Sequence, residues 1–274
     1  LQAPVLNRRE TSWTQVDSFM KAELAKLKAS SKKIRLVSST VNSPSTKAVI
    51  AEFVAANPTA KLVQVDAVSY TGIIQANQNS FGKAVVPHYQ FDKADVIVSF
   101  GADFLGTWIS PVEFTRQYSA NRGAASLKNK KMSRHIQFET GMSLTGTNAD
   151  ARIAIKPSEE GIALLNLYQA LGGKVVAKKL ANNPKADKAI QLAARELANA
   201  KGKALVVCGS NDVSSQIIVN AINALLGSYG STINLNNASN QFAGNDAEFV
   251  AFINEMKRGE VGAVLFLNSN PAYS

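Results

Sequence analysis

The sequence predicts an α/β fold built from doubly wound, Rossmann-like domains whose sheets are mainly parallel. Short apolar runs alternate along the chain with longer segments that carry helix start and stop signals. The runs are continuously apolar, which indicates strands buried on both faces, as in a parallel sheet covered by helices. The repeated order of strand and helix favours a doubly wound architecture. The expected strands are residues 34–39, 61–66, 95–101, 135–139, 204–209 and 262–268.

Capping residues predict where the helices between these strands begin. Ser12 and Gln15 resemble a capping box before a helix that reaches about Lys28. Pro44 and Pro111 suit the first turns of two further helices. Other helices are expected to start at Ser158, at Asp212 or Ser214 and at Asn245, and to end near Gly172, Gly227 and Gly259.

Length and composition limit the classes of protein to which the chain can belong. The 274 residues are 46% hydrophobic, enough for a large core in one large or two ordinary domains. The longest apolar runs fall far short of the roughly 20 residues of a membrane-spanning helix. Because the chain begins at Leu1 without a methionine or a signal-like segment, we expect it to be a fragment of a longer polypeptide.

The formal charge of +10 is the unusual feature of the composition. Lys128, Lys130, Lys131 and Arg134 crowd together before residues 135–139. No aromatic residues or binding motif accompany them, so a solvated loop is favoured over a nucleic-acid site. A second basic segment, residues 174–188, also looks like exposed surface, and an acidic protein or anionic lipid head groups stay open as its partner.

The candidate binding residues follow the predicted strands, because ligands of open α/β sheets bind beyond the carboxyl ends of the strands. Small residues there allow backbone N–H groups to approach a phosphate, and Asp103 or Glu139 could accept hydrogen bonds from a ribose. The alternative is that these are ordinary turns between strand and helix. The candidates are Gly101, Asp103, Glu139, Gly209, Asn211, Asn268 and Asn270.

Several common kinds of site lack their motifs in this sequence. Neither GxGxxG nor GxxxxGK[ST] occurs, which speaks against nicotinamide and ATP enzymes. His88 and His135 stand apart from any metal-ligand pattern, so structural roles are expected for both. Cys208 is expected to be buried and unligated, because one thiolate cannot hold an iron–sulfur cluster. Trp13 and Trp108 are expected to pack against helices or partner subunits.

Several longer stretches resemble the molybdopterin oxidoreductases. FDKADVIVSFGADFLGTWISPVEFTRQY, residues 91–118, resembles that family, and FGADFLGTW-SPVE is closer to the degenerate version in the large iron–sulfur subunit of alternative complex III. HIQFETGMSLTGTNADARIAIKPSEEGIALL, residues 135–165, follows in the order typical of the family. ALVVCGSND, LFLNSNPAYS and the opening NRRETSWTQVDSFM are also similar, so the resemblance covers nearly the whole chain.

The resemblance implies two domains, one inserted in the other. Residues 1–66 and 238–274 would form part of the first, and residues 67–237 the second. Active members carry a molybdenum ligand where this chain has AVSYTG, so Ser69 marks the vestigial metal-ligand position. Many members have Pro-Gly where this chain has Pro157-Ser158. The resemblance therefore implies a vestigial crevice and no cofactor in this segment, with iron–sulfur clusters in the remainder of the subunit.

The expected function is that of a non-catalytic, pterin-free scaffold in a quinol-oxidising respiratory complex. The resemblance implies export by the twin-arginine route and peripheral attachment at the periplasmic face of the bacterial inner membrane. The implied partners are a membrane quinol-binding subunit, cytochrome c subunits and a terminal oxidase, without nucleic acid. The alternatives are a fragment of an active molybdenum bis-pterin enzyme of the polysulfide or thiosulfate reductase type, with Ser69 as ligand, and a periplasmic α/β module that binds a small anion.

Overall fold

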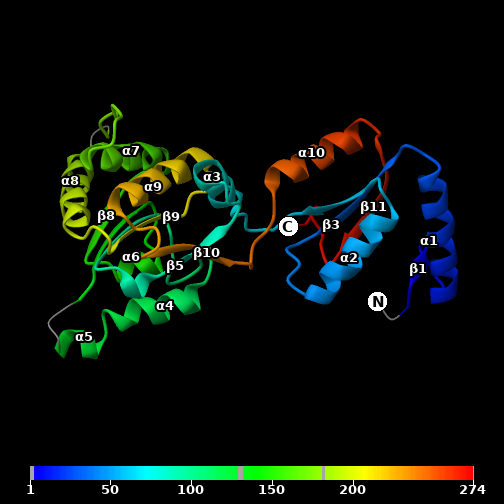
Figure 1. Ribbon diagram of the computed structural model, residues 1–274, viewed down its shortest axis with the longest axis horizontal. Helices are drawn as coiled ribbons and strands as arrows, with labels where there is room; N and C mark the ends of the chain where they lie inside the picture. Colours follow the sequence, from blue (N-terminus) through cyan, green and yellow to red (C-terminus); the bar gives the residue numbers. More distant parts are fainter. Residues whose placement is uncertain (1–2, 129–131, 181–182, 274) are drawn as a thin grey trace. The chain divides into compact units, whose positions relative to one another are not determined.

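The computed structural model describes residues 3–128, 132–180 and 183–273, and the chain in it divides into two compact units (Figure 1). Unit 1 consists of Leu1–Ser69 and Phe242–Ser274, and unit 2 of Tyr70–Gln241. The chain leaves unit 1 once and returns once, so unit 2 is inserted in unit 1. The junctions fall at 69/70 and 241/242, where the sequence analysis placed them at 66/67 and 237/238.

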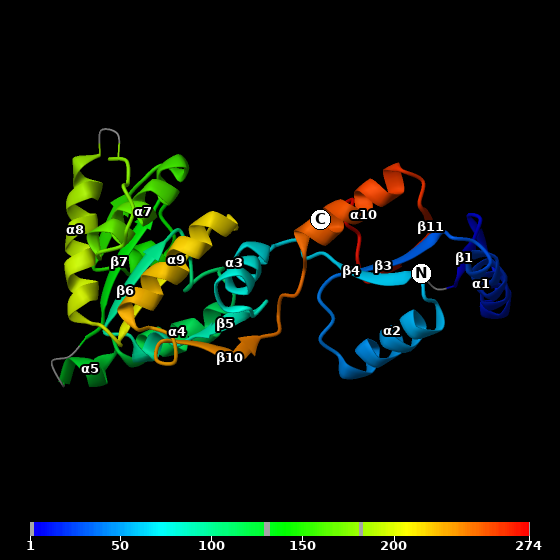
Figure 2. The same cartoon turned by 45° about the horizontal axis from the view of Figure 1, so that its top comes forward.

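Unit 1 is a three-stranded parallel sheet between two helices. Its strand order is β11 (Val261–Leu267), β3 (Lys33–Ser38) and β4 (Ala60–Gln64). Helices α2 (Pro44–Ala56) and α10 (Asp246–Lys257) cover opposite faces (Figure 2). The unit also holds the hairpin of β1 (Val5–Leu6) and β2 (Arg9–Glu10), and helix α1 (Trp13–Lys28).

Unit 2 is built around a four-stranded parallel sheet. The spatial order is β8 (Ala151–Ala154), β7 (Arg134–Glu139), β6 (Val96–Phe100) and β9 (Ala204–Cys208). An antiparallel pair, β5 (Val86–Tyr89) and β10 (Ile233–Ser239), lies apart from it. The helices are α3 (Thr71–Phe81), α4 (Pro111–Ala120), α5 (Ala124–Lys128), α6 (Leu144–Thr147), α7 (Glu160–Ala170), α8 (Pro184–Asn199) and α9 (Val213–Leu226), with 3-10 turns at Phe91–Lys93 and Pro157–Glu159.

The order of these strands contains a reversal. From β6 the chain adds β7 and then β8 on one side, and it then crosses back to place β9 on the other side of β6. Val98 in β6 therefore pairs with Ile136 of β7 on one side and with Val206 of β9 on the other. This is the topological switch point at which doubly wound sheets form their crevice. The α/β fold class with parallel sheets is confirmed.

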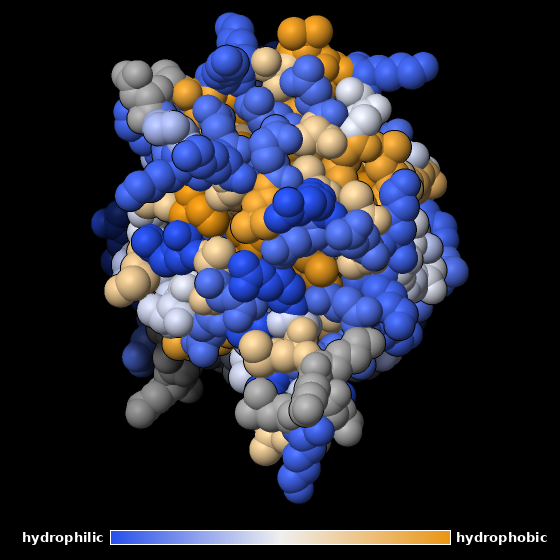
Figure 3. All heavy atoms as spheres, turned by 90° about the vertical axis from the view of Figure 1, so that its left-hand side faces the viewer, coloured by the Kyte–Doolittle hydropathy of each residue, from blue (hydrophilic) through white to orange (hydrophobic). Residues whose placement is uncertain are grey.

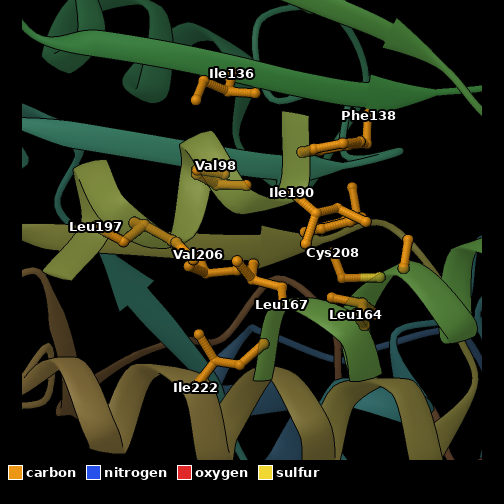
Figure 4. Close-up of a cluster of buried hydrophobic side chains, with 14 of the residues drawn as sticks. Val98, Ile136, Phe138, Leu164, Leu167, Ile190, Leu197, Val206, Cys208 and Ile222 are labelled. Atoms are coloured by element: carbon orange, nitrogen blue, oxygen red, sulfur yellow. The ribbon is translucent and has the colours of Figure 1, made fainter. Parts of the chain in front are cut away.

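The sheet of unit 2 is buried on both faces, as the continuous apolar runs predict. Alternate residues of β6, β7 and β9 pack against α7, α8 and α9 in the main core (Figure 4). In that core the rings of Phe100 and Phe138 stack with their centroids 4.8 Å apart. The opposite face meets α4, where the Tyr118 hydroxyl hydrogen-bonds the ring of His135 at 3.1 Å. Burial lowers the pKa of His135 to about 4, so this histidine is a neutral core residue near pH 7.

The predicted helix starts hold in all places but one. Ser12 and Gln15 form the capping box of α1, and Pro44 opens α2. Ser158 does not cap a helix, because it lies inside the 3-10 turn that precedes α7. Trp13 begins α1, and it is 70% exposed, so it is not buried against the helices of this chain as Trp108 is. Trp108 is buried, as expected, although it lies three residues before α4.

Two further sequence expectations concern charge and membranes. Lys128 and Arg134 lie at the end of α5 and the start of β7, while Lys130 and Lys131 fall outside the described residues. The basic segment from Lys174 leads into α8, and its lysines are exposed. Within the described parts of the chain, no helix combines the length and the apolar character needed to cross a membrane.

Candidate functional site

The carboxyl ends of β6, β7 and β9 surround a pocket of about 560 Å³ in unit 2. Its position follows from the topology, because the turns after β6 and β9 leave the sheet at the point where the strand order reverses. The predicted Gly101, Glu139 and Gly209 all lie in its wall. The lining residues are Gly101, Glu139, Thr140, Gly141, Ser143, Pro157, Glu160, Gly161, Gly209, Ser210, Asp212 and Ser215.

Two glycines allow the turns after β6 and β9 to touch. A Cβ on Gly209 would lie 2.5 Å from the carbonyl oxygen of Gly101, a contact with rigid backbone. Gly101 has a φ of +60°, a left-handed conformation that glycine adopts without steric cost. The amide of Gly209 donates to the carbonyl of Phe100 at 2.8 Å and continues the parallel pairing to its end. Glycine is therefore a requirement of the fold at these positions.

Glu139 is buried in the wall and fully engaged by neighbours within unit 2. Its carboxylate accepts hydrogen bonds from the Ser143 hydroxyl at 2.6 Å and from the Gln137 amide at 3.2 Å, and it pairs with Arg152. Burial alone would raise the pKa of Glu139, but the hydrogen bonds from Ser143 and Arg152 outweigh it and hold the pKa below the usual range. Glu139 is thus ionised, and its ion pair with Arg152 joins β7 to β8.

Glu160 also lines the pocket, and Cys208 lies behind it in the buried strand β9. The Cys208 thiol donates to Glu160 Oε1 at 3.1 Å, and the Ser210 amide donates to the sulfur at 3.4 Å. Burial raises the pKa of Glu160, and the hydrogen bond from Cys208 opposes this only in part. Burial also raises the pKa of the thiol well above its usual range. Cys208 is buried, as predicted, and is not an activated nucleophile.

Asp212 occupies the start of α9, the position at which such folds commonly meet a phosphate. Its carboxylate accepts from both the amide and the hydroxyl of Ser215, each at 2.8 Å. These hydrogen bonds, the one from the Ser215 amide above all, lower the pKa of Asp212. The positive end of α9 is therefore satisfied by a negative charge of the chain itself.

Asp103 and Asn211 follow their strands as predicted but do not line the pocket. Asp103 accepts from the amide and the hydroxyl of Thr145, at 3.1 and 2.8 Å, and so joins its loop to α6. Asn211 Oδ1 accepts from the amide of Gly72 at 2.8 Å and joins its turn to α3. Both side chains hold unit 2 together.

The remaining predicted residues belong to unit 1. Asn268 and Asn270 follow β11, and Asn268 has a positive φ of +48°. The structure therefore brings together three of the seven candidates in one pocket and places these two in the other compact unit. Ser69 also belongs to unit 1, where its hydroxyl donates to Asp246 Oδ2 at 2.6 Å at the start of α10.

Glu160, Asp212 and Ser143 were not predicted as pocket residues. Asp212 was predicted only as a possible helix start, and Glu160 lies two residues after the predicted start at Ser158. A polar residue at a helix start next to a strand end was the available signal, because that is the edge at which the pocket forms. Within the described residues, no group of histidine, cysteine and carboxylate side chains is arranged to hold a metal ion.

The residues of this pocket do not fit the phosphates of a pterin dinucleotide. Its lining holds three carboxyl groups and no lysine or arginine. Phosphates in proteins are met by free helix N-termini and by cationic side chains. Here Asp212 already occupies the start of α9, and Arg152 is paired with Glu139.

Comparison with known proteins shows a likeness of fold. No family model and no curated protein matches the chain. Acetylene hydratase from Pelobacter acetylenicus is 12% identical with a TM-score of 0.53; the match covers 85% of this chain and 35% of that one, so this chain spans about a third of its length. The formyltransferase/hydrolase complex from Methylorubrum extorquens, solved with methylofuran, is 16% identical with a TM-score of 0.60. That match covers 96% of this chain and 76% of the other. The first likeness agrees with a molybdopterin-oxidoreductase-like fold, and neither bears on alternative complex III.

The contact between the two glycine turns predicts a large difference between two alanine substitutions. Gly209→Ala should lower the free energy of unfolding by about 2–3 kcal/mol, because the new Cβ would meet the backbone of Gly101. Gly141→Ala is the matched control, since its Cβ would meet nothing within 4 Å. Urea unfolding of both variants measures the difference, and equal stability would contradict the close approach.

The engagement of Glu139 predicts a pH-dependent loss of stability. At pH 7, Glu139→Gln should unfold more easily by about 1.5–3 kcal/mol, because charged hydrogen bonds to Ser143 and Arg152 are lost. The pKa of Glu139 is lowered in the folded state, so its contribution is present above the ordinary carboxyl pKa and disappears as the pH falls through the folded value. The gap between wild type and variant should therefore close in acid, and a constant gap would argue against an ionised Glu139.

Proposed function

We propose that this chain is a non-catalytic, pterin-free scaffold segment of an electron-transfer subunit in a quinol-oxidising respiratory complex of the alternative complex III type. The molybdopterin-oxidoreductase-like fold is the coarse basis of the proposal. The observation that carries it is the carboxylate lining of the pocket at the switch point, which has no cation to meet a phosphate. The assignment to alternative complex III rests on the sequence resemblance.

Electrostatics make this pocket a poor phosphate site. The lowered pKa of Asp212 keeps its carboxylate charged near pH 7. A phosphate charge at about 4 Å from it would meet a repulsion of about 4 kcal/mol at an effective dielectric constant of about 20. No lysine or arginine in the lining offsets this repulsion. The same lining weighs against a module that binds a small anion at this place.

The contact of Ser69 weighs against an active molybdenum enzyme. A serine that ligates a metal binds it through a deprotonated oxygen, whereas this hydroxyl keeps its proton and donates a hydrogen bond to Asp246 Oδ2 at 2.6 Å. Asp246 is the first residue of α10, so this hydrogen bond joins the chain at Ser69 to the start of α10 within unit 1. Ser69 thus has a structural task that explains its presence.

The wider setting is proposed from the resemblance alone. The remainder of the subunit would carry the iron–sulfur clusters. The segment would assemble with a membrane quinol-binding subunit, cytochrome c subunits and a terminal oxidase. The assembly would lie at the periplasmic face of the inner membrane after export by the twin-arginine route. In this setting the chain would offer a contact surface to the other subunits, and the electrons would pass between the groups that those subunits and the remainder of this one hold.

Metal and pterin analysis of the full-length protein, purified from its own membranes, tests the proposal directly. We expect molybdenum and tungsten far below one atom per chain, and no fluorescent pterin derivative after oxidative release, because the pocket disfavours phosphate. A molybdenum enzyme purified from the same cells controls for cofactor supply. Stoichiometric metal with pterin would overturn the scaffold assignment.

A substitution in the pocket tests the non-catalytic role separately. Glu160→Gln keeps the size of the side chain and removes its ability to ionise or to act as an acid. If the pocket is not an active site, Glu160 takes no part in the reaction. Quinol oxidation by the assembled complex should then stay within about twofold of wild type. Activity is compared at equal amounts of assembled complex. A loss of several orders of magnitude with assembly intact would show that the pocket is an active site.

A further inference from the structure

Four lysines project from unit 2 around the start of α8. Lys178 and Lys179 lie in the loop after α7, and Lys185 and Lys188 lie in the first two turns of α8. All four are exposed, and within residues 3–128, 132–180 and 183–273 none of them forms an ion pair. We call these four residues the α8 lysine cluster. Figure 3 views the molecule from the side on which α8 lies in Figure 1, and long hydrophilic side chains project from that face.

The backbone beneath the α8 lysine cluster is anchored to the core. Leu180 is 3% exposed and belongs to the main core of unit 2. The Asn166 side chain donates to the carbonyl of Lys178 at 2.7 Å. Asn183 caps α8 by accepting from the amide of Ala186 at 3.1 Å. Lys178–Leu180 and the first turn of α8 are therefore anchored, and the four lysine side chains extend from them into solvent.

The charges of the cluster work against the helix that carries two of them. The start of a helix is the positive end of its dipole, where acidic side chains stabilise and basic ones destabilise. Asp187 is the acidic residue in the first turn of α8, whereas Lys185 adds a positive charge in that turn and Lys188 adds another at the beginning of the second. Among the residues of unit 2 that the structure describes, none forms an ion pair with these lysines. A negatively charged partner outside the chain accounts for an arrangement that local stability does not favour.

The composition of this face favours a lipid surface over a protein or a nucleic acid. Residues 171–200 contain no aromatic residue and a single arginine, Arg195. Protein interfaces are enriched in aromatic residues and arginine and depleted of lysine, and nucleic-acid sites commonly add stacking aromatics. Anionic lipid head groups require only an array of positive charges. Val176, 92% exposed in the same loop, adds an apolar side chain suited to the head-group region.

We propose that the α8 lysine cluster docks unit 2 on the surface of an anionic bilayer. The inference rests on the proposed function in that it names the face by which a peripheral subunit would meet its membrane. Docking of this kind is electrostatic and reversible, and it weakens as salt screens the charges.

The test is sedimentation of the full chain with phosphatidylcholine vesicles that contain about one third phosphatidylglycerol. Replacing all four lysines of the cluster by glutamine (K178Q, K179Q, K185Q and K188Q together) should weaken binding at least about tenfold, since each lysine near such a surface contributes roughly fivefold. The matched control carries K21Q, K28Q, K47Q and K257Q, four exposed lysines of unit 1 with the same change in net charge. The control should bind nearly as the wild type does, and pure phosphatidylcholine should bind neither.

Three results would overturn the proposal. The first is no binding of the wild type to anionic vesicles at low salt, and the second is equal weakening by both quadruple variants. The third is tighter binding to a random DNA duplex than to vesicles at the same salt, which would make nucleic acid the partner. None of these results depends on cofactor content. A pterin-free protein that fails to bind lipid would therefore overturn the docking and leave the scaffold function standing.

Discussion

The pairing of β9 with β6 is the interaction on which unit 2 depends. The two strands are far apart in the chain, and their pairing places β9 on the side of β6 opposite to β7. Gly209 then approaches the backbone of Gly101 so closely that no other residue fits without a shift. The reversal of strand order and the pocket at its end follow from this pairing.

The charges of unit 2 are divided between its pocket and its surface. The carboxyl groups of Glu139, Glu160 and Asp212 gather at the strand ends, and each has a partner within the unit. The exposed lysines near α8 have none among the described residues. The pocket therefore stabilises itself and disfavours phosphate, while the outer face is available to a negatively charged surface.

Side-chain direction beyond the strand ends was harder to predict than the strands themselves. Asp103 and Glu139 occupy similar positions after β6 and at the end of β7, yet Asp103 turns to Thr145 and Glu139 to Ser143 and Arg152. Both satisfy local backbone and side-chain donors, as buried polar groups must. Ser158 was wrongly predicted as a helix start. The preceding Pro157 begins a 3-10 turn, and the sequence alone does not distinguish a 3-10 turn from the first turn of an α-helix.

The sequence by itself determined the strands β3, β4, β6, β7, β9 and β11, the starts of α1, α2, α4, α9 and α10, and the α/β class, because continuous apolarity and capping residues act over a few neighbouring positions. It also determined that Gly101, Glu139 and Gly209 stand at strand ends. Only the tertiary structure decided that these three share a pocket with Glu160 and Asp212, since strand order is set by packing between distant segments. The same packing places Asn268 and Asn270 in the other compact unit, a division that the family resemblance implied and that no local pattern encodes.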